Sequence, residues 1–345
     1  MKGKALLFGL NYSHCKDGKL NGCINDVRHI SNQLKALFGA DFPTEIYTDD
    51  FDQKNTSYDG IIKNLYNLAI ESYRDNLEFV WVHYSGHGSY QRDTSGDELD
   101  FMDEGLVPSD YESKGILIDD ILNHVISRFN PNTKILFVCD SCHSGSILDL
   151  KYTWNVTTRQ STIDNKKCTV KAKTILISGC MDNQTSADAY NLLNDKQHIG
   201  ALTACFIKVL ERKPQQLYDV FSFVDSVRKE LKIQGFAQYP CLTSTFDIAN
   251  EPAMTLPSKQ TIYNKPSQQP LPPPPKMYNQ IYNRNIPVTQ DQNSKPVYYE
   301  TNNTYMRSVP MQQNTQQYVQ PNLQPYYPPP VYITYIQLPL QSYYI

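Results

Sequence analysis

A cysteine and a histidine each follow an apolar segment that is typical of a buried strand. The segment 77–84 runs into SGHG (85–88), and the segment 134–139 runs into DSC (140–142). A thiol becomes a good nucleophile when a base lies within hydrogen-bond reach, and backbone N–H groups can hold the oxyanion that its attack creates. The neighbouring glycines allow tight turns and a close approach of the backbone to a ligand. The pair therefore indicates nucleophilic catalysis by Cys142, with His87 as its base.

Each residue taken alone has a more ordinary interpretation. Cys142 could be a plain buried thiol and His87 a loop histidine, and Cys139-x-x-Cys142 also matches a redox or zinc pair. However, Cys139 belongs to the predicted strand and should face the sheet, and the sequence has no second CxxC to complete a zinc site. The joint placement of a cysteine and a histidine at two strand ends favours catalysis.

Alternating strands and helices must position this pair. Helical spacing of apolar residues alternates with short apolar runs along the first 250 residues. This order predicts an α/β domain with a mainly parallel sheet that is covered by helices on both faces, and ligands of such sheets bind beyond the carboxyl ends of the strands. The predicted strands are 4–9, 45–48, 77–84, 134–139, 174–178 and 241–245, the last closing the sheet, and the predicted helices span about 27–37, 62–69, 121–129, 201–210 and 220–231.

Composition places the domain boundary near residue 250. Only five of the 22 prolines of the 345-residue chain precede that point, and the segment 251–345 is rich in Pro, Gln, Asn and Tyr. Such a segment cannot bury enough apolar surface to order itself, so we expect a disordered tail that binds unidentified proteins. A net charge of -3 argues against a nucleic-acid partner, and no apolar stretch approaches the ~20 residues of a membrane span. We expect a cytoplasmic monomer whose eight cysteines remain thiols.

Six sequence boxes occur in order: GCINDV (22–27), HYSGHG (83–88), MDEGLVPSDY (102–111), ILIDD (116–120), DSCHSG (140–145) and SGCMDNQTSADA (178–189). They resemble those of the metacaspases, which are relatives of the caspases. The spacing between His87 and Cys142 agrees with the roughly 50 residues expected for caspase-like enzymes. The resemblance implies a caspase–hemoglobinase fold and a cysteine endopeptidase with a type I-like core, although the Pro/Gln-rich segment that usually precedes such cores follows this one.

The resemblance also assigns roles to matching positions. It implies that the backbone N–H groups of Gly88 and Cys142 form the oxyanion hole. It implies a substrate pocket for the residue before the scissile bond, lined by Cys23, Asp26, Ser85 and Asp140. The implied calcium ligands are Asp103, Asp119, Asp120 and Asp149.

The residue types are compatible with these roles. Two carboxylates, Asp26 and Asp140, would favour a guanidinium or ammonium group and repel an acidic one, so we expect cleavage of proteins and peptides after Arg or Lys. A calcium site is expected to contain several carboxylate oxygens from separate loops. The alternative for Asp26, Asp119 and Asp120 is an ordinary role at a helix N-terminus.

The segment 150–173 is predicted to be an exposed linker. It is polar and shows no helical or strand periodicity, and exposed loops are preferred sites of proteolytic nicking. It contains Arg159, Lys166 and Lys167, which the proposed pocket would accept, so we expect the enzyme to be a zymogen that processes itself there. Other functions remain open at this point: a legumain-like peptidase, a non-catalytic scaffold that recruits partners through its tail, and a thiol–disulfide protein.

Overall fold

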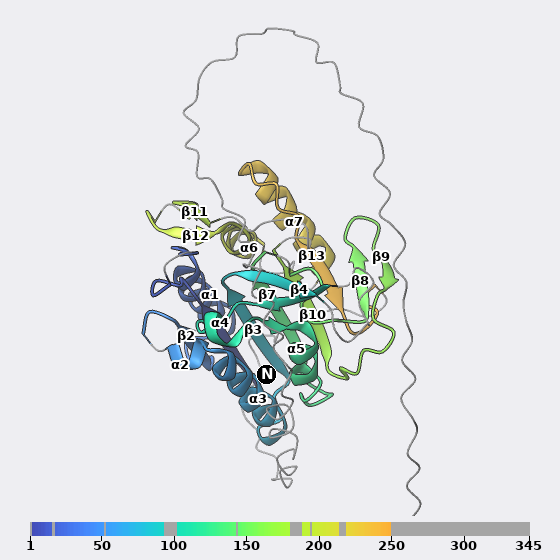
Figure 1. The fold of residues 1–345 in the computed structure, drawn as a ribbon. Coiled ribbons are helices and arrows are strands. Elements are labelled where there is room, and N and C mark those ends of the chain that lie inside the picture. The colour runs from blue at the N-terminus through green and yellow to red at the C-terminus, as the bar shows by residue number, and fades with distance from the viewer. Residues whose placement is uncertain are drawn as a thin grey trace, which may run out of the picture. The chain divides into compact units, whose positions relative to one another are not determined.

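The computed structural model describes residues 2–15, 18–51, 53–92, 102–142, 144–179, 188–193, 195–213 and 219–249, and the predicted tail lies outside them. The described chain forms an eight-stranded sheet with the strand order β2-β1-β3-β7-β10-β13-β8-β9 (Figure 1). These strands are β1 (Gly3–Gly9), β2 (Thr44–Thr48), β3 (Phe79–Ser85), β7 (Lys134–Asp140), β8 (Tyr152–Asn155), β9 (Gln160–Ile163), β10 (Lys173–Ser178) and β13 (Cys241–Ser244).

The centre of the sheet is parallel, as the sequence predicts. Strands β2, β1, β3, β7 and β10 all pair in parallel. Every residue of β3 is buried, and β7 is buried after its first residue. Their almost continuous apolar sequences reflect this, because a parallel strand is covered on both faces and needs no polar side.

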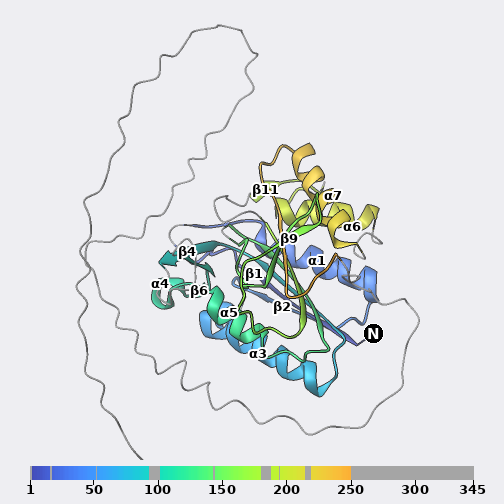
Figure 2. The ribbon, with the colours of Figure 1, turned by 90° about the vertical axis from the view of Figure 1, so that its right-hand side faces the viewer.

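Helices cover both faces of the sheet (Figure 2). One core lies under α1, α6 and α7, and the other lies under α3 and α5. Each of these five helices presents an apolar stripe to the sheet; on α1 the stripe contains Val27, Ile30 and Leu34, at the spacing of one helical face. The helices are α1 (Cys23–Phe38), α2 (Gln53–Thr56), α3 (Tyr58–Arg74), α4 (Tyr111–Lys114), α5 (Asp119–Ile126), α6 (Ala201–Arg212) and α7 (Val220–Ile233).

The linker differs from its prediction. The expectation of an irregular loop over 150–173 is wrong in its first half, because β8 and β9 form an antiparallel hairpin there. This hairpin pairs with β13 through β8. Strand β13 is therefore an interior strand and does not close the sheet. The irregular part of the linker is the shorter stretch between Ile163 and Lys173, where β9 ends and β10 begins.

Two small sheets flank the ends of the parallel strands. One has the order β4-β5-β6 and comprises Gly88–Arg92, Met102–Leu106 and Leu117–Ile118. The other pairs β11 (Asp188–Tyr190) with β12 (His198–Gly200). Strand β4 begins directly after His87, and β12 leads directly into α6, so both small sheets border the edge where catalysis is predicted. None of the described helices is both long and apolar enough to cross a membrane.

Candidate active site

The sheet register brings the predicted nucleophile and base to the same edge. In the parallel pair β3–β7, Ser85 lies opposite Asp140. His87 and Cys142 each follow two residues later, so both leave the carboxyl ends of neighbouring strands. The two segments touch, because a Cβ at Gly88 would overlap the carbonyl oxygen of Cys142. Only a glycine permits this approach, which puts the two predicted oxyanion-hole residues side by side.

The imidazole of His87 is held in one tautomer. Its Nε2 lies 2.6 Å from the carbonyl oxygen of Gly18, and a carbonyl can only accept, so Nε2 carries the hydrogen. The other nitrogen, Nδ1, is then free of a proton and can accept one. Burial lowers the pKa of His87 below its usual 6.5, while the contact with the Gly18 carbonyl raises it less. A pKa below 6.5 leaves the ring neutral at pH 7, which is the form that a general base needs.

The two cysteines of Cys139-x-x-Cys142 have different environments. Cys139 is fully buried within β7, and burial raises the pKa of its thiol to about 12. Its Sγ contacts the hydroxyl of Ser141 at 3.2 Å. Cys142 is partly exposed, and neither cysteine forms a disulfide. Because the thiolate is the reactive form, Cys139 is inert at neutral pH, and the prediction that it faces the sheet is confirmed.

The two predicted pocket carboxylates meet at Gly200. A Cβ on Gly200 would overlap the Oδ2 of Asp140 and lie 2.8 Å from the Oδ2 of Asp26. Asp26 accepts hydrogen bonds from the Ser85 hydroxyl and from the Gly200 N–H, and Asp140 accepts from the N–H and the hydroxyl of Thr203. Both carboxylates are buried, with exposed fractions of 0% and 3%. The structure thus brings together residues from α1, β3, β7 and the β12–α6 junction.

This geometry excludes the alternative role of Asp26 as a helix N-cap. Asp26 is not a helix N-cap, because α1 is capped at Gly22 and the Asp26 side chain bonds to other elements. Cys23, the fourth predicted pocket residue, is the first residue of α1 and is buried. Gly200 and Thr203 were missed by the sequence analysis, because nothing in the sequence shows that the start of α6 abuts the end of β7.

Three acidic side chains interact beside the loop that follows the nucleophile. Asp119, which is 1% exposed, accepts hydrogen bonds from the backbone N–H groups of Glu104 and Asp120. Burial raises the pKa of Asp119 to about 9, and the negative charges of Asp149 and Glu104 raise it further than those two hydrogen bonds lower it. Glu104 also accepts from the Ser146 hydroxyl at 2.7 Å. Three carboxyl groups therefore share a poorly solvated region that contacts the loop after Cys142 through Ser146.

This cluster differs from the predicted calcium set. Glu104 faces it in addition to Asp119 and Asp149, and it was not predicted. Its neighbour on β5, Asp103, was predicted but projects to the opposite face of the strand, where its Oδ2 lies 3.4 Å from Gln91 Nε2. Asp120 is exposed in the first turn of α5. Nowhere in the described chain do three acidic, His or Cys side chains converge closely enough to hold a metal ion.

The three candidate processing residues differ in accessibility. Arg159 sits at the tip of the β8–β9 hairpin, where it donates to Asp219 Oδ2 at 2.6 Å and lies over the ring of Phe221. Lys166 and Lys167 are exposed and lie in the irregular stretch between β9 and β10. The two lysines therefore lie outside the paired strands, whereas Arg159 is held in a paired hairpin.

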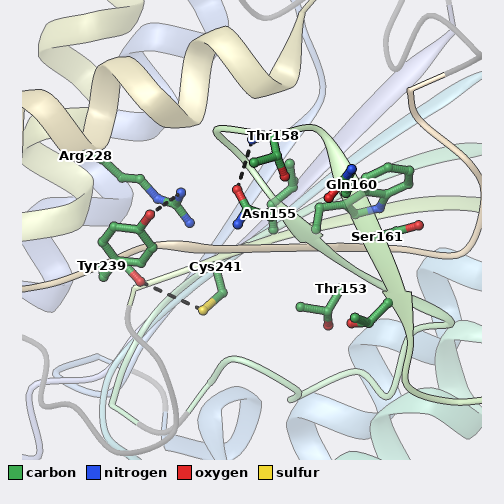
Figure 3. Close-up of a pocket in the computed structure, with 11 residues that line it drawn as sticks. Thr153, Asn155, Thr158, Gln160, Ser161, Arg228, Tyr239 and Cys241 are labelled. Carbon is green, nitrogen blue, oxygen red and sulfur yellow. Dashed lines mark hydrogen bonds between the residues drawn. The ribbon is translucent and has the colours of Figure 1, made fainter.

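An open groove of about 460 Å³ lies between the β8–β9 hairpin and β13 (Figure 3). Arg228 stacks on the ring of Tyr239 and donates two hydrogen bonds to the carbonyl oxygen of Pro240. These contacts fix the segment that leads into β13. None of the predicted catalytic, pocket or calcium residues lines this groove, so it is distinct from the candidate active site.

A mainly parallel sheet between two helical layers, with a cysteine and a histidine at the ends of adjacent central strands, is the arrangement of a caspase-like cysteine peptidase. A family model described as "Metacaspase, peptidase C14 domain" matches residues 3–151. The chain is 33% identical to Metacaspase-1 of Candida glabrata over 296 residues, which cover 71% of this chain and 73% of that protein. It is 37% identical to Metacaspase-1 of Arabidopsis thaliana over 249 residues, which cover 67% of this chain and 65% of that protein.

The chain therefore belongs to the metacaspase family, and it is a cysteine-type endopeptidase. The expected resemblance is confirmed. Among solved structures, a protein from Geobacter sulfurreducens matches with a TM-score of 0.49 and 26% identity, over 71% of this chain and 93% of that one. Caspase-1 from Spodoptera frugiperda matches with a TM-score of 0.42 and 14% identity, over 71% of this chain and 86% of that one.

Proposed function

We propose that this metacaspase is a calcium-dependent endopeptidase that cleaves proteins after Arg or Lys through a dyad of Cys142 and His87. The observation that carries the specificity is the meeting of the two buried carboxylates, Asp26 and Asp140, at the bare Cα of Gly200. Asp140 lies two residues before the nucleophile, so a basic side chain bound there would place the following peptide bond next to Cys142. A guanidinium offers several donors to such a pair, whereas an acidic side chain would be repelled.

In the proposed mechanism, the dyad residues and two backbone N–H groups each have one task. His87 Nδ1 takes the proton of the Cys142 thiol, and the thiolate attacks the carbonyl carbon after the basic residue. The N–H groups of Gly88 and Cys142 stabilise the oxyanion. The protonated imidazole then gives its proton to the leaving amine, and a thioester remains on Cys142. Water, deprotonated by His87, hydrolyses the thioester and regenerates the free thiol.

A peptide panel separates this function from its alternatives. Fluorogenic peptides with Arg, Lys, Asn or Asp before the scissile bond would be assayed with calcium and with excess chelator. We expect cleavage of the Arg and Lys peptides only. Preferential cleavage after Asn would support the legumain-like alternative. The thiol–disulfide alternative is disfavoured by the buried Cys139 thiol, whose pKa of about 12 makes it a poor partner in disulfide exchange.

Calcium fits the acidic cluster in donor chemistry. Carboxylate oxygens are the ligands that this cation prefers, and a divalent cation would relieve the repulsion that raises the pKa of Asp119. We propose that calcium draws together Asp119, Asp149 and Glu104, which do not converge closely enough for a metal ion in the described chain. The other two predicted ligands lie elsewhere, Asp103 beside Gln91 on the opposite face of β5 and Asp120 in the exposed first turn of α5. When bound, calcium would supply positive charge that orders the loop between Cys142 and Asp149.

Removing one carboxylate charge should weaken the calcium response. Asp119→Asn is preferable to Asp119→Ala, because the amide oxygen can still accept one of the two backbone N–H groups that the carboxylate accepts, whereas alanine can accept neither. We expect the variant to need roughly tenfold or more calcium for half-maximal activity, because ligand charge sets calcium affinity. Magnesium should substitute poorly, since it demands tighter octahedral geometry.

The response can also be measured without activity. In the Cys142→Ala background, calcium should raise the melting temperature, and Asp119→Asn should remove most of that rise. Asp59→Asn, which alters an exposed carboxylate that is paired with Lys114, is the matched control and should leave the rise intact. Full activity in excess chelator would remove calcium from the mechanism.

Self-processing should occur at Lys166 or Lys167 in preference to Arg159. The side chain of Arg159 is engaged by Asp219 and Phe221 in a paired hairpin, whereas the two lysines are exposed in an irregular stretch. Mass spectrometry of the purified protein with calcium should find new termini after Lys166 or Lys167, and none in the Cys142→Ala form.

Matched variants locate the cut. Replacing both lysines by alanine should leave the chain intact in calcium, while Arg159→Ala should still be cut. The nicked halves should co-elute under native conditions, because β10 stays paired with β7. Cleavage that persists in the double lysine variant would contradict this assignment. An uncut chain that is fully active would show that activity does not require the cut.

A further inference from the structure

The backbone N–H of His87 is hydrogen-bonded to a buried tyrosine from a loop that is far away in the sequence. The hydroxyl of Tyr12 accepts a hydrogen bond from the His87 N–H at 3.0 Å and donates one to the carbonyl oxygen of Val107 at 2.7 Å. The ring of Tyr12 also lies against the imidazole, with centroids 4.8 Å apart. A second buried tyrosine, Tyr84, places its hydroxyl 2.9 Å from the His87 carbonyl oxygen. Both ends of the residue and one face of its ring are thus in contact with tyrosines.

The same loop supplies the carbonyl group that sets the tautomer. Gly18 lies six residues after Tyr12, and its carbonyl oxygen faces His87 Nε2. A Cβ on Gly86 would lie 2.8 Å from the Tyr12 hydroxyl and 2.7 Å from the Tyr84 hydroxyl, so both hydroxyls reach the turn only because residue 86 has no side chain. The loop that contains Tyr12 therefore packs closely against the turn that precedes His87.

Tyr12 adopts a backbone conformation that needs support. Its φ of 52° lies in the left-handed region, which bulky residues seldom occupy. The carboxylate of Asp49, a buried residue just after β2, accepts the backbone N–H groups of Asn11, at 2.9 Å, and of Tyr12 itself. Those two hydrogen bonds oppose the backbone strain from outside the loop. Neither Asp49 nor Tyr12 is near enough to the nucleophile in the chain for the sequence to suggest a link to it.

We propose that Tyr12 is a positioning residue for catalysis, which fixes the backbone and the ring of His87 against Cys142, and that Asp49 acts through Tyr12 by holding it in its strained conformation. The inference rests on the proposed role of His87 as the base. A base must lie within hydrogen-bond reach of the thiol, and small misplacements of catalytic groups have large effects on rate. Substrate binding, by contrast, is proposed to depend on other residues, Asp26 and Asp140 beside Gly200.

The proposal predicts a loss in kcat with little change in KM. Tyr12→Phe keeps the ring but removes the hydroxyl that accepts the His87 N–H. We expect kcat on an Arg peptide to fall roughly 10- to 100-fold, with KM within about twofold of the parent. Alkylation of Cys142 by iodoacetamide, followed by mass spectrometry, should also slow, because the imidazole no longer takes the thiol proton efficiently. That readout needs no substrate.

A matched control separates positioning from stability. The hydroxyl of Ser72, equally buried, also accepts a backbone N–H, from Asn130, and donates to a carbonyl oxygen, of Ala69, but it lies at the opposite end of the sheet. Ser72→Ala should lower the melting temperature about as much as Tyr12→Phe while leaving kcat and the alkylation rate unchanged. An equal loss of kcat in Ser72→Ala, or a kcat within twofold of the parent in Tyr12→Phe, would overturn the proposal.

Asp49→Asn gives a second test should Tyr12→Phe fold poorly. It lies outside the catalytic segments and weakens only the support of the loop, so its kcat should fall while KM holds. The double variant should lose no more than the worse single variant, since both act through one contact. Additive losses would contradict the proposed chain of contacts. Activity retained in His87→Ala would contradict the proposed dyad itself. Activity retained only in the Tyr12 and Asp49 variants would contradict the positioning role and leave the dyad unaffected.

Discussion

Replacing Cys142 by alanine is expected to abolish peptide hydrolysis, because no other described thiol leaves a strand end beside His87. Replacing His87 by alanine should reduce kcat roughly 10²- to 10⁴-fold, the usual contribution of general acid–base catalysis. Both would be measured with an Arg peptide at saturating calcium. The residual activity of the His87 variant should rise with pH, because hydroxide rather than the imidazole must then remove the thiol proton.

Cys139→Ala is the matched control for the nucleophile. It removes a thiol three residues away that is fully buried and protonated at neutral pH. Its hydrolysis rate should remain close to that of the parent, although loss of the packed sulfur should lower stability slightly. If Cys139 proved essential and Cys142 dispensable, Cys142 would not be the nucleophile, and the thiol–disulfide alternative would be open again.

Asp140→Asn is expected to lower kcat/KM for Arg peptides roughly 10- to 100-fold, since a hydrogen bond to a charged group is worth about 1.5–3 kcal/mol. Gly200→Ala should have a similar effect for a different reason. Its added Cβ would overlap the Asp140 carboxylate and crowd that of Asp26, so it would displace the two carboxylates that are proposed to bind the substrate guanidinium. Neither variant should gain activity on Asp peptides, because both retain the Asp26 carboxylate.

Two controls show whether these losses belong to the pocket. Thr203→Ser keeps the hydroxyl that donates to Asp140 and should retain activity, whereas Thr203→Val should not. The rate at which iodoacetamide alkylates Cys142 should stay the same in Gly200→Ala, since this reagent does not use the pocket. Efficient hydrolysis of Asp peptides by the parent enzyme would be the outcome that removes the carboxylates from substrate recognition.

The sequence was most informative where one physical requirement dominates the choice of residue. Strands β3 and β7 are covered on both faces, so their uninterrupted apolar runs could be recognised and their ends located. The turns that follow them contain Gly86 and Gly88, whose lack of a side chain is required by close contacts. Together these signals were enough to predict that Cys142 and His87 lie at one edge of the sheet.

Other features left little trace in the sequence. The β8–β9 hairpin turns through Arg159, whose φ is 58°, and the turn lacks the glycine or Asn-Gly signal that usually marks a hairpin. Glu104 was missed because the direction of a side chain on a short strand depends on register, which exchanges the faces of Asp103 and Glu104. The contact between Tyr12 and His87 is set by a loop conformation, and no local pattern encodes it.

The strand order has a further consequence for the proposed cut. Strands β10 and β13 follow the two lysines in the chain, yet in the sheet they lie between β7 and β8, which precede them. After cleavage, two strands of the downstream piece would therefore remain inserted in the sheet between strands of the upstream piece. Separating them would mean breaking two strand interfaces at once. Because a cut peptide bond does not re-form, the processed state would persist after calcium is removed. The downstream piece would stay bound and would not exchange between molecules.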